Sequence, residues 1–220
     1  MGGVPPFCLP GSVLPPVLCC PAFPAGASGK LPAVLLIHGS TPADLDFTVM
    51  GEGGQPLSSI FRDISGALGA RGIAVLRYNK HYVSGPGQVD YQKFYGQADL
   101  KTFLKDAETA LNAMKRDPRV DPRRIFVYGW SEGSSVAAQL VRDHPEVRGL
   151  ILQGMNDANT PEPYLMTLQQ AIVQARGRAT IKRYAGLGHT LGPASSMVDD
   201  NFRPIAPAPL SDMAEWILRH

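Results

Sequence analysis

A glycine–serine–glycine pattern after a short apolar run is the feature that most limits how this chain can fold. Residues 125–133 read Ile-Phe-Val-Tyr-Gly-Trp-Ser-Glu-Gly, and residues compatible with a helix follow up to Val141. A serine held on a very tight turn between a strand and a helix needs neighbours without side chains two positions before and after it. Gly129 and Gly133 meet that need. The pattern therefore predicts a strand, a strained turn at Ser131 and a helix directly after it.

Such a turn is typical of a nucleophilic serine. It lifts the Ser131 hydroxyl away from the backbone and aims a helix N-terminus, with its partial positive charge, at the same place. The alternative is a glycine-rich turn with an ordinary serine, because the chain contains 23 glycines. The strand–turn–helix context favours the nucleophile.

A serine nucleophile needs a base, and His189 is the best candidate. It follows the serine in the chain and lies in a glycine-flanked loop directly after the strand-like segment 179–184. Such a loop can present an imidazole without obstruction from neighbouring side chains. The other histidines either precede the serine or occupy a helix end or the chain terminus: His38, His81, His144 and His220.

The base needs an acid, and Asp157 is the candidate. It follows the apolar run 147–154, so we expect it at the carboxyl end of a strand, where a carboxylate can fix the imidazole tautomer. A plain Asx-turn is the other interpretation of this residue, and both can hold together. Asp199 and Asp200 come after His189, and we expect them to face solvent.

Two backbone amides are expected to bind the oxyanion. One belongs to Glu132, directly after the serine. The other belongs to Ser40, with Thr41 as the alternative, because a sharp turn at His38-Gly39 ends the apolar run 33–37. We interpret His38 as a residue that shapes this turn.

Two long loops, 41–57 and 79–98, are expected to shape a substrate site. The second holds several rings, which either line a pocket or pack the loop onto the sheet; the sequence favours neither. We predict Thr41, Tyr82 and Trp130 as substrate contacts.

Apolar strands alternate with amphipathic segments along the chain. Helices are expected over 58–71, 99–116, 164–176 and 210–219, with strands between them. This alternation predicts an α/β fold with a mostly parallel sheet covered by helices on both faces. Ligands of such sheets gather at the carboxyl ends of the strands, where all the candidate loops would meet.

These segments resemble the α/β-hydrolase family, in particular compact members without a large cap, such as the dienelactone-hydrolase-like esterases. The resemblance also extends to the catalytic domains of prolyl-oligopeptidase-type peptidases. It covers roughly residues 30–219, and it is carried by the turn His38-Gly39, the segment 70–78, the serine turn, Gln153-Gly154-x-x-Asp157 and Gly188-His189.

The resemblance implies a serine hydrolase with a Ser131–His189–Asp157 triad, a nucleophile elbow and an oxyanion hole, and without a cofactor or metal. Because no cap segment is evident, we expect a carboxylesterase that acts on small or accessible esters. A peptidase or a thioesterase would use the same triad, and a non-catalytic binding module on this fold is the alternative from another class.

The chain departs from the family pattern between the serine and the acid. Only 26 positions separate Ser131 from Asp157, whereas most relatives insert a further strand and helix, or a cap. Either one strand–helix unit is missing, or the acid has moved to the preceding strand.

Composition restricts the other functions. The 220 residues are 44% hydrophobic with a net charge of +2, which fits a single domain over 33–220 and gives no reason to expect nucleic acid as a partner. No apolar run approaches the ~20 residues of a membrane span. Residues 1–32 hold eight prolines and all three cysteines, at spacings that fit neither metal ligation nor a disulfide scaffold, and are expected to form an arm or edge ribbon. They lack a secretion-signal pattern, which favours the cytoplasm. No feature indicates an oligomeric state.

Overall fold

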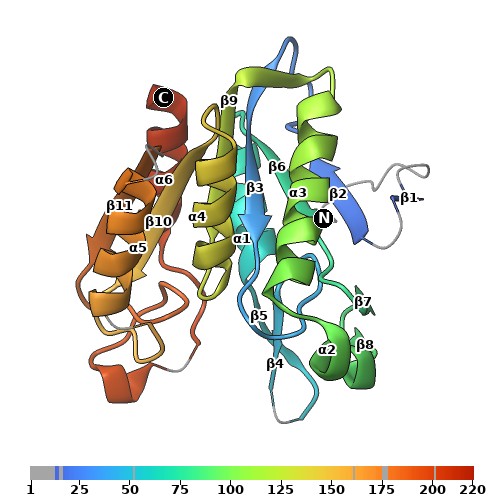
Figure 1. Cartoon of the computed structure of the whole chain (residues 1–220). Coiled ribbons are helices and arrows are strands. Elements are labelled where there is room, and N and C mark those ends of the chain that lie inside the picture. Colours follow the sequence, from blue (N-terminus) through green and yellow to red (C-terminus); the bar gives the residue numbers. More distant parts are fainter. Residues whose placement is uncertain (1–12, 15–16, 52, 161, 175–177, 201) are drawn as a thin grey trace.

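A twisted sheet runs through the molecule. The computed structural model describes residues 13–14, 17–51, 53–160, 162–174, 178–200 and 202–220, and within them seven strands pair in the order β1-β2-β6-β3-β9-β10-β11 (Figure 1). These strands are β1 (Val13–Leu14), β2 (Val17–Ala22), β3 (Leu31–Ile37), β6 (Ala74–Tyr78), β9 (Val120–Gly129), β10 (Arg148–Gly154) and β11 (Arg178–Tyr184).

The sheet is mostly parallel, as the sequence predicted. From β6 to β11 every neighbouring pair is parallel, whereas β2 pairs antiparallel with β6 and β1 antiparallel with β2. β2 belongs to the expected N-terminal arm, much of which lies outside the described residues. Within the part that the structure describes, no helix is long and apolar enough to cross a membrane.

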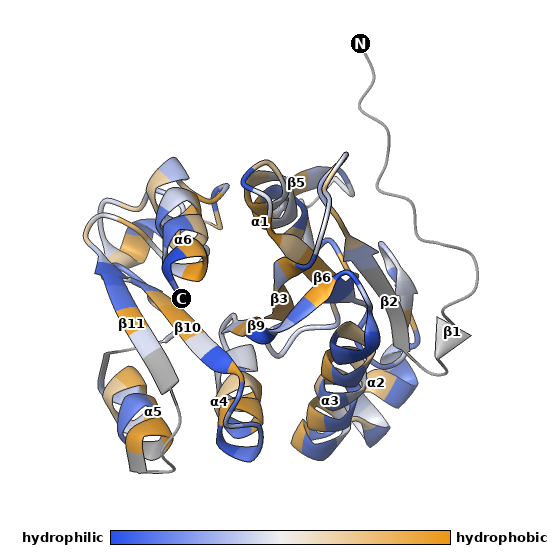
Figure 2. Ribbon diagram, turned by 90° about the horizontal axis from the view of Figure 1, so that it is seen from above, coloured by the Kyte–Doolittle hydropathy of each residue, from blue (hydrophilic) through white to orange (hydrophobic). Residues whose placement is uncertain are grey.

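Helices cover both faces of the sheet. In Figure 2, α3, α4 and α5 lie on one side of the strands, and α1 and α6 lie on the other. The helices are α1 (Ile60–Gly69), α2 (Tyr91–Gln97), α3 (Leu100–Arg116), α4 (Gly133–Asp143), α5 (Glu162–Gln174) and α6 (Pro207–Arg219).

The alternation of side chains along β3 explains why there are two cores. Leu35 and Ile37 pack with the α3–α4–α5 layer, whereas Val34 and Leu36 pack with the α1–α6 layer. Successive residues of a strand point to opposite faces, so a strand covered on both sides must be apolar throughout. This accounts for the continuous apolar run that predicted the strand.

The expected helices and strands are present with small differences at their ends. The two long loops, however, contain structure that the sequence pattern did not reveal. The first contains the hairpin of β4 (Thr48–Met50) and β5 (Pro56–Ser59), and the second contains the hairpin of β7 (Val83–Gly85) and β8 (Gln88–Val89), followed by α2. Elements of two to seven residues are too short to show a period of their own.

One strand lies between the serine turn and the acid. β10 pairs directly with β9, which leads into the serine turn, and β11 pairs with β10 on its other side. Asp157 follows β10, so the candidate acid lies at the end of the strand next to β9, the strand that leads into the serine turn. The carboxyl ends of β3, β9, β10 and β11 all reach the lower end of the molecule in Figure 1, where the long loops gather.

His38 closes the end of β3 and is buried in the core. Its Nε2 lies 3.0 Å from the carbonyl oxygen of Asp44, and its ring packs on that of Phe61 with 4.6 Å between centroids. Its Nδ1 has no hydrogen-bond partner among the described residues. Burial, followed by the positive charges of Lys80 and Arg77, lowers the pKa of His38 to about 3, against the opposing effect of the Asp44 carbonyl. His38 is therefore neutral in the folded protein, and it stabilises the turn through ring packing and its contact with the Asp44 carbonyl.

We expect His38 to make the protein sensitive to acid. Its pKa is lower in the folded state than in the unfolded state, so the unfolded chain binds more protons and stability falls as the pH drops below about 6.5. Between pH 7 and pH 5 this residue should remove about 2 kcal/mol from the free energy of unfolding. We therefore expect the decrease in the free energy of unfolding between pH 7 and pH 5, measured with urea, to be about 2 kcal/mol smaller in His38→Gln than in the wild-type protein. An equal decrease in the wild-type protein and in His38→Gln would contradict the conclusion that His38 is buried in its neutral form.

Candidate active site

Ser131 lies on the strained turn between β9 and α4. Its φ of 55° places a non-glycine residue in the left-handed region, which is costly and persists only where the surroundings enforce it. The amide of Trp130 donates to the carbonyl of Ile37 at 3.0 Å, which ties the turn to the end of β3. A Cβ on Gly133 would collide with the carbonyl oxygens of Ile37 and His38. The strand–turn–helix that the sequence predicted is confirmed, and the glycine is required by close backbone contact.

Asp157 and His189 are directly bonded. Nδ1 of His189 lies 2.9 Å from each carboxylate oxygen of Asp157, and both side chains are buried. A carboxylate can only accept, so Nδ1 carries the proton. Nε2 is then the nitrogen that remains able to accept a proton, and it has no partner among the described residues.

Asp157 is held as an anion by several donors. The amides of Asn159 and Thr160 donate to Oδ1 at 2.7 and 2.8 Å, and the side-chain amide of Gln153 donates to Oδ2 at 3.1 Å. Burial opposes ionisation, but the hydrogen bond and charge of His189 with these amides hold the pKa of the Asp157 carboxyl below its usual value. Asp157 therefore makes an Asx-turn and also binds the imidazole, so the two interpretations of the sequence are compatible.

The loop that carries His189 is anchored by two neighbours. Nε1 of Trp130 donates to the carbonyl of His189 at 2.9 Å, and the two rings pack with 4.5 Å between centroids. The amide of His189 donates to the carboxylate of Asp200 at 2.9 and 3.0 Å. The expectation that Asp200 faces solvent is wrong. Asp200 is half-buried and packs against Gly188, because the segment after His189 folds back onto the loop that carries His189.

Ser131, Asp157 and His189 line one pocket together with Trp130 and Gln153. Ser131 also lines a second, more open hollow of about 390 Å³, bounded by the start of α3, by α4, by α5 and by the turn after β10. Its other lining residues are Leu100, Glu132, Ser135, Asn159, Thr160 and Tyr164. The Ser131 hydroxyl makes no hydrogen bond within the described residues. Such bonds are often long before a substrate is bound.

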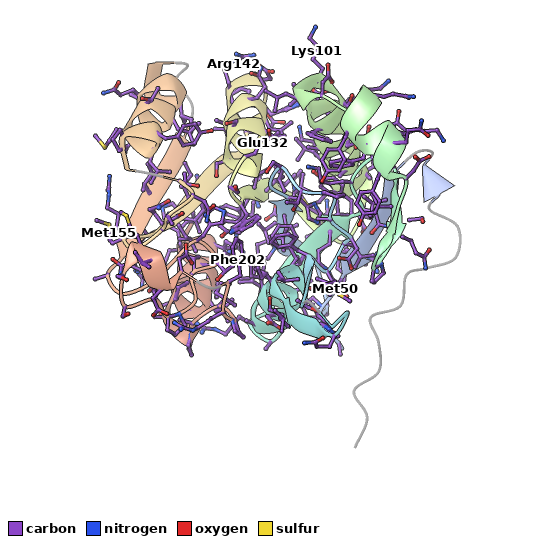
Figure 3. All side chains as sticks on the ribbon, turned by 90° about the horizontal axis from the view of Figure 1, so that it is seen from below. Met50, Lys101, Glu132, Arg142, Met155 and Phe202 are labelled. Carbon is purple, nitrogen blue, oxygen red and sulfur yellow. The ribbon has the colours of Figure 1, made fainter. Side chains whose placement is uncertain are left out.

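The candidate oxyanion donors are open. The amides of Ser40 and Glu132 bond to no acceptor in the part of the chain that the structure describes. Glu132 is the N-cap of α4, where free N–H groups and the helix dipole favour negative charge. Gly39 packs on the serine turn so closely that a Cβ would lie 2.9 Å from the Cβ of Ser131. Figure 3 views this edge of the sheet, with Glu132 labelled at the start of α4.

The predicted substrate contacts separate into different places. Thr41 is exposed beside Ser40. Trp130 lies in the pocket of the triad, but its ring is buried between His189 and Phe47, so it supports the site from beneath. Tyr82 lines a different hollow, formed by the β7–β8 hairpin and its flanks, and bonds to Gln97. The structure therefore does not bring Tyr82 together with Ser131.

Sequence reasoning missed Gln153 and Lys80. Gln153 stands out in the sequence only as part of the segment before Asp157 that carries the resemblance, and nothing there assigns a role to its side chain. Lys80 follows β6 and is 3% exposed, an unusual position for a lysine. Within the described residues no three histidine, cysteine, aspartate or glutamate side chains converge as metal ligands.

Comparison with known proteins gives both family and fold. Residues 49–185 match the family described as serine aminopeptidase, S33. Esterase EstD of Thermotoga maritima is 35% identical over 117 residues, which are 51% of this chain. The chain covers only 24% of that relative's length.

Solved structures resemble most of the chain. A dienelactone hydrolase of Anabaena variabilis has 15% identity and a TM-score of 0.64, covering 93% of this chain and 92% of its own. A thermophilic esterase of Thermogutta terrifontis has 13% identity and a TM-score of 0.60, covering 92% and 89%. At these identities the likeness concerns the fold. Since the family match spans more than half of the chain, the protein belongs to the serine aminopeptidase S33 family of hydrolases, with the compact α/β-hydrolase fold of the dienelactone hydrolases.

Proposed function

We propose that the protein is a serine hydrolase that cleaves carboxylic esters through an acyl-enzyme. The observation that carries the proposal is the pocket shared by Ser131, Asp157 and His189, in which the imidazole is already bonded to the acid through Nδ1. The esterase named among the relatives supports the same activity. The ionised state of Asp157 supports it further, because an anion stabilises the imidazolium that forms when the base takes a proton.

The mechanism follows from the positions of these groups. Nε2 of His189 takes the proton of Ser131 as its oxygen attacks the ester carbonyl, and the amides of Ser40 and Glu132 hold the oxyanion. The imidazolium then gives its proton to the leaving alcohol. Water repeats the sequence on the acyl-enzyme, which releases the carboxylic acid and restores the serine.

The surroundings of Ser131 favour small or accessible esters. The open hollow beside it is bounded by short polar side chains, by the exposed face of Tyr164 and by Leu100 at the start of α3. The described chain carries no large cap: near the carboxyl edge of the sheet Figure 1 shows α2 and the short hairpins β4–β5 and β7–β8. We infer from the open hollow that an ester reaches Ser131 without displacing a folded element.

A peptidase is the second candidate, because the matching family is described as serine aminopeptidase. The same serine, base and acid would serve it. Glu132, which lines the open hollow, is an acidic side chain able to bind the free amine of an aminopeptidase substrate. We place the ester first because the curated relative is named an esterase.

Labelling with a fluorophosphonate tests the nucleophile. We expect one label on the peptide that contains Ser131, because Ser131 shares a pocket with His189, whereas the hydroxyl of Ser134 in the same pocket donates to the carbonyl of Gly129. Ser131→Ala should remove both the label and the turnover of a short-chain aryl ester, with an unchanged thermal unfolding temperature. The matched variant Ser84→Ala, in the β7–β8 hairpin, should keep both. Full activity of Ser131→Ala would exclude the proposal, and small-molecule binding without any label would indicate a non-catalytic module.

Replacement of the acid tests the triad. Asp157→Asn should lower kcat by about 10³- to 10⁴-fold, because an amide in this place favours the wrong imidazole tautomer. Asp200→Asn should cost far less, since within the described residues the hydrogen bonds of that carboxylate come from the backbone amides of His189 and Ala158 and not from the imidazole. Asp143→Asn, on the exposed end of α4, is the matched control and should leave kcat unchanged. A larger loss in Asp200→Asn than in Asp157→Asn would reverse the assignment.

A substrate panel separates the candidate activities. We compare an aryl ester, an aryl thioester and an amino-acid anilide of equal acyl size, and expect the highest kcat/KM for the ester. Higher kcat/KM for the anilide would favour the peptidase, and for the thioester a thioesterase. Because leaving-group reactivity alone favours esters over anilides, the comparison is made against a serine peptidase assayed with the same three compounds.

A further inference from the structure

A buried lysine lies directly behind the proposed oxyanion hole. Lys80 comes two residues after β6, which pairs with β3, and its amide donates to the carbonyl of Ala43 at 3.2 Å. Its Nζ donates to the carbonyl oxygen of Gly39 at 2.5 Å. The side chain is 3% exposed, so its ammonium has been taken out of water.

The groups around Lys80 stabilise its positive charge without forming an ion pair. The ammonium lies 3.7 Å from the ring centroid of Phe103 and 5.2 Å from that of Phe94, and within the described residues no carboxylate lies at ion-pair distance from it. Burial lowers the pKa of Lys80 to about 8, against the more distant carboxylates of Glu132 and Asp106, so it remains mostly protonated at neutral pH. Burying a charge costs free energy unless strong acceptors and rings compensate, and the Gly39 carbonyl is the acceptor used here.

The peptide bond between Gly39 and Ser40 links this lysine to the reaction. In a trans peptide the C=O and the N–H point in opposite directions. Since Lys80 binds the Gly39 carbonyl, the Ser40 amide of the same peptide unit points away from Lys80. That amide bonds to no acceptor in the described chain, and Gly39 packs on Ser131 with no room for a side chain.

We propose that Lys80 is a positioning residue of the oxyanion hole, which fixes the Gly39–Ser40 peptide plane and polarises its N–H toward the oxyanion. A positively charged donor that binds the carbonyl oxygen makes the N–H of the same peptide unit a stronger hydrogen-bond donor, because hydrogen bonds in a chain polarise one another. The proposal selects Ser40 over Thr41 as the donor. It rests on the proposed function, since an oxyanion forms only if Ser131 attacks a carbonyl.

The test compares Lys80→Met, which keeps length but removes the donor, with Lys80→Gln, which keeps a neutral donor. Loss of one oxyanion donor costs about 10²–10³ in rate, so weakening one should lower kcat by about 10- to 100-fold. KM for the aryl ester should stay within about threefold, because the interaction is made in the transition state. Lys80→Gln should recover part of kcat. Lys93→Met, an exposed lysine on α2, is the matched control and should behave as wild type.

Two inhibitors separate positioning from a general structural effect. A trifluoromethyl ketone forms a tetrahedral oxyanion with the serine, so its Ki should rise in Lys80→Met by the same factor as kcat falls. The Ki of the product carboxylic acid should stay unchanged. The proposal would be overturned if both inhibitors bound more weakly by the same factor, or if the substitution raised KM and left kcat unchanged. If Lys80→Met does not fold, as judged by thermal unfolding, the same measurements on Lys80→Gln decide.

The two proposals fail separately. Fluorophosphonate labelling of the wild-type serine, together with unaltered kinetics in Lys80→Met and Lys80→Gln, overturns the role of Lys80 alone. Absence of labelling in the wild-type protein overturns the proposed function and the role of Lys80 with it.

Discussion

The left-handed turn at Ser131 is the constraint on which the site depends. A φ of 55° is unfavourable for a serine and must be enforced from outside. The enforcement comes from β3: its terminal carbonyls touch Gly133, the Ile37 carbonyl accepts the amide of Trp130, and Gly39 packs on the serine itself. The elbow and the proposed oxyanion loop are therefore one packed unit, in which neither turn can move without the other.

The second half of the site is organised around a buried carboxylate. Asp157 receives donors from its own turn and from Gln153 within β10, and it gives its remaining acceptor capacity to His189. The imidazole is fixed from the other side by Trp130, whose position follows from the serine turn. The proposed base is thus aligned by contacts from two strands, so that a residue on a loop is held as precisely as one on a rigid element.

Much of the fold follows from patterns that can be read along the chain. Continuous apolar runs predicted β3 and β9, because strands buried on both faces have no polar side to show. Amphipathic repeats predicted α1, α3, α5 and α6, and the glycine spacing predicted the serine turn. The short hairpins and α2 were missed, since their stability comes from packing against the sheet rather than from a local period. Tyr82, in the same region, was predicted as a substrate contact from its place in a long loop, and the structure puts it in a separate hollow.

The sequence by itself determined the strained turn at the candidate serine, the order of the candidate serine, acid and base, and the sheet that would carry them, because each depends on local spacing and backbone sterics. Tertiary structure alone decided that β10 lies beside β9, that Asp200 folds back onto the His189 amide, and that a lysine is buried behind Gly39. These three facts depend on which segments meet across the carboxyl edge of the sheet. Contacts between residues far apart in the chain leave no period or spacing in the sequence from which they can be read.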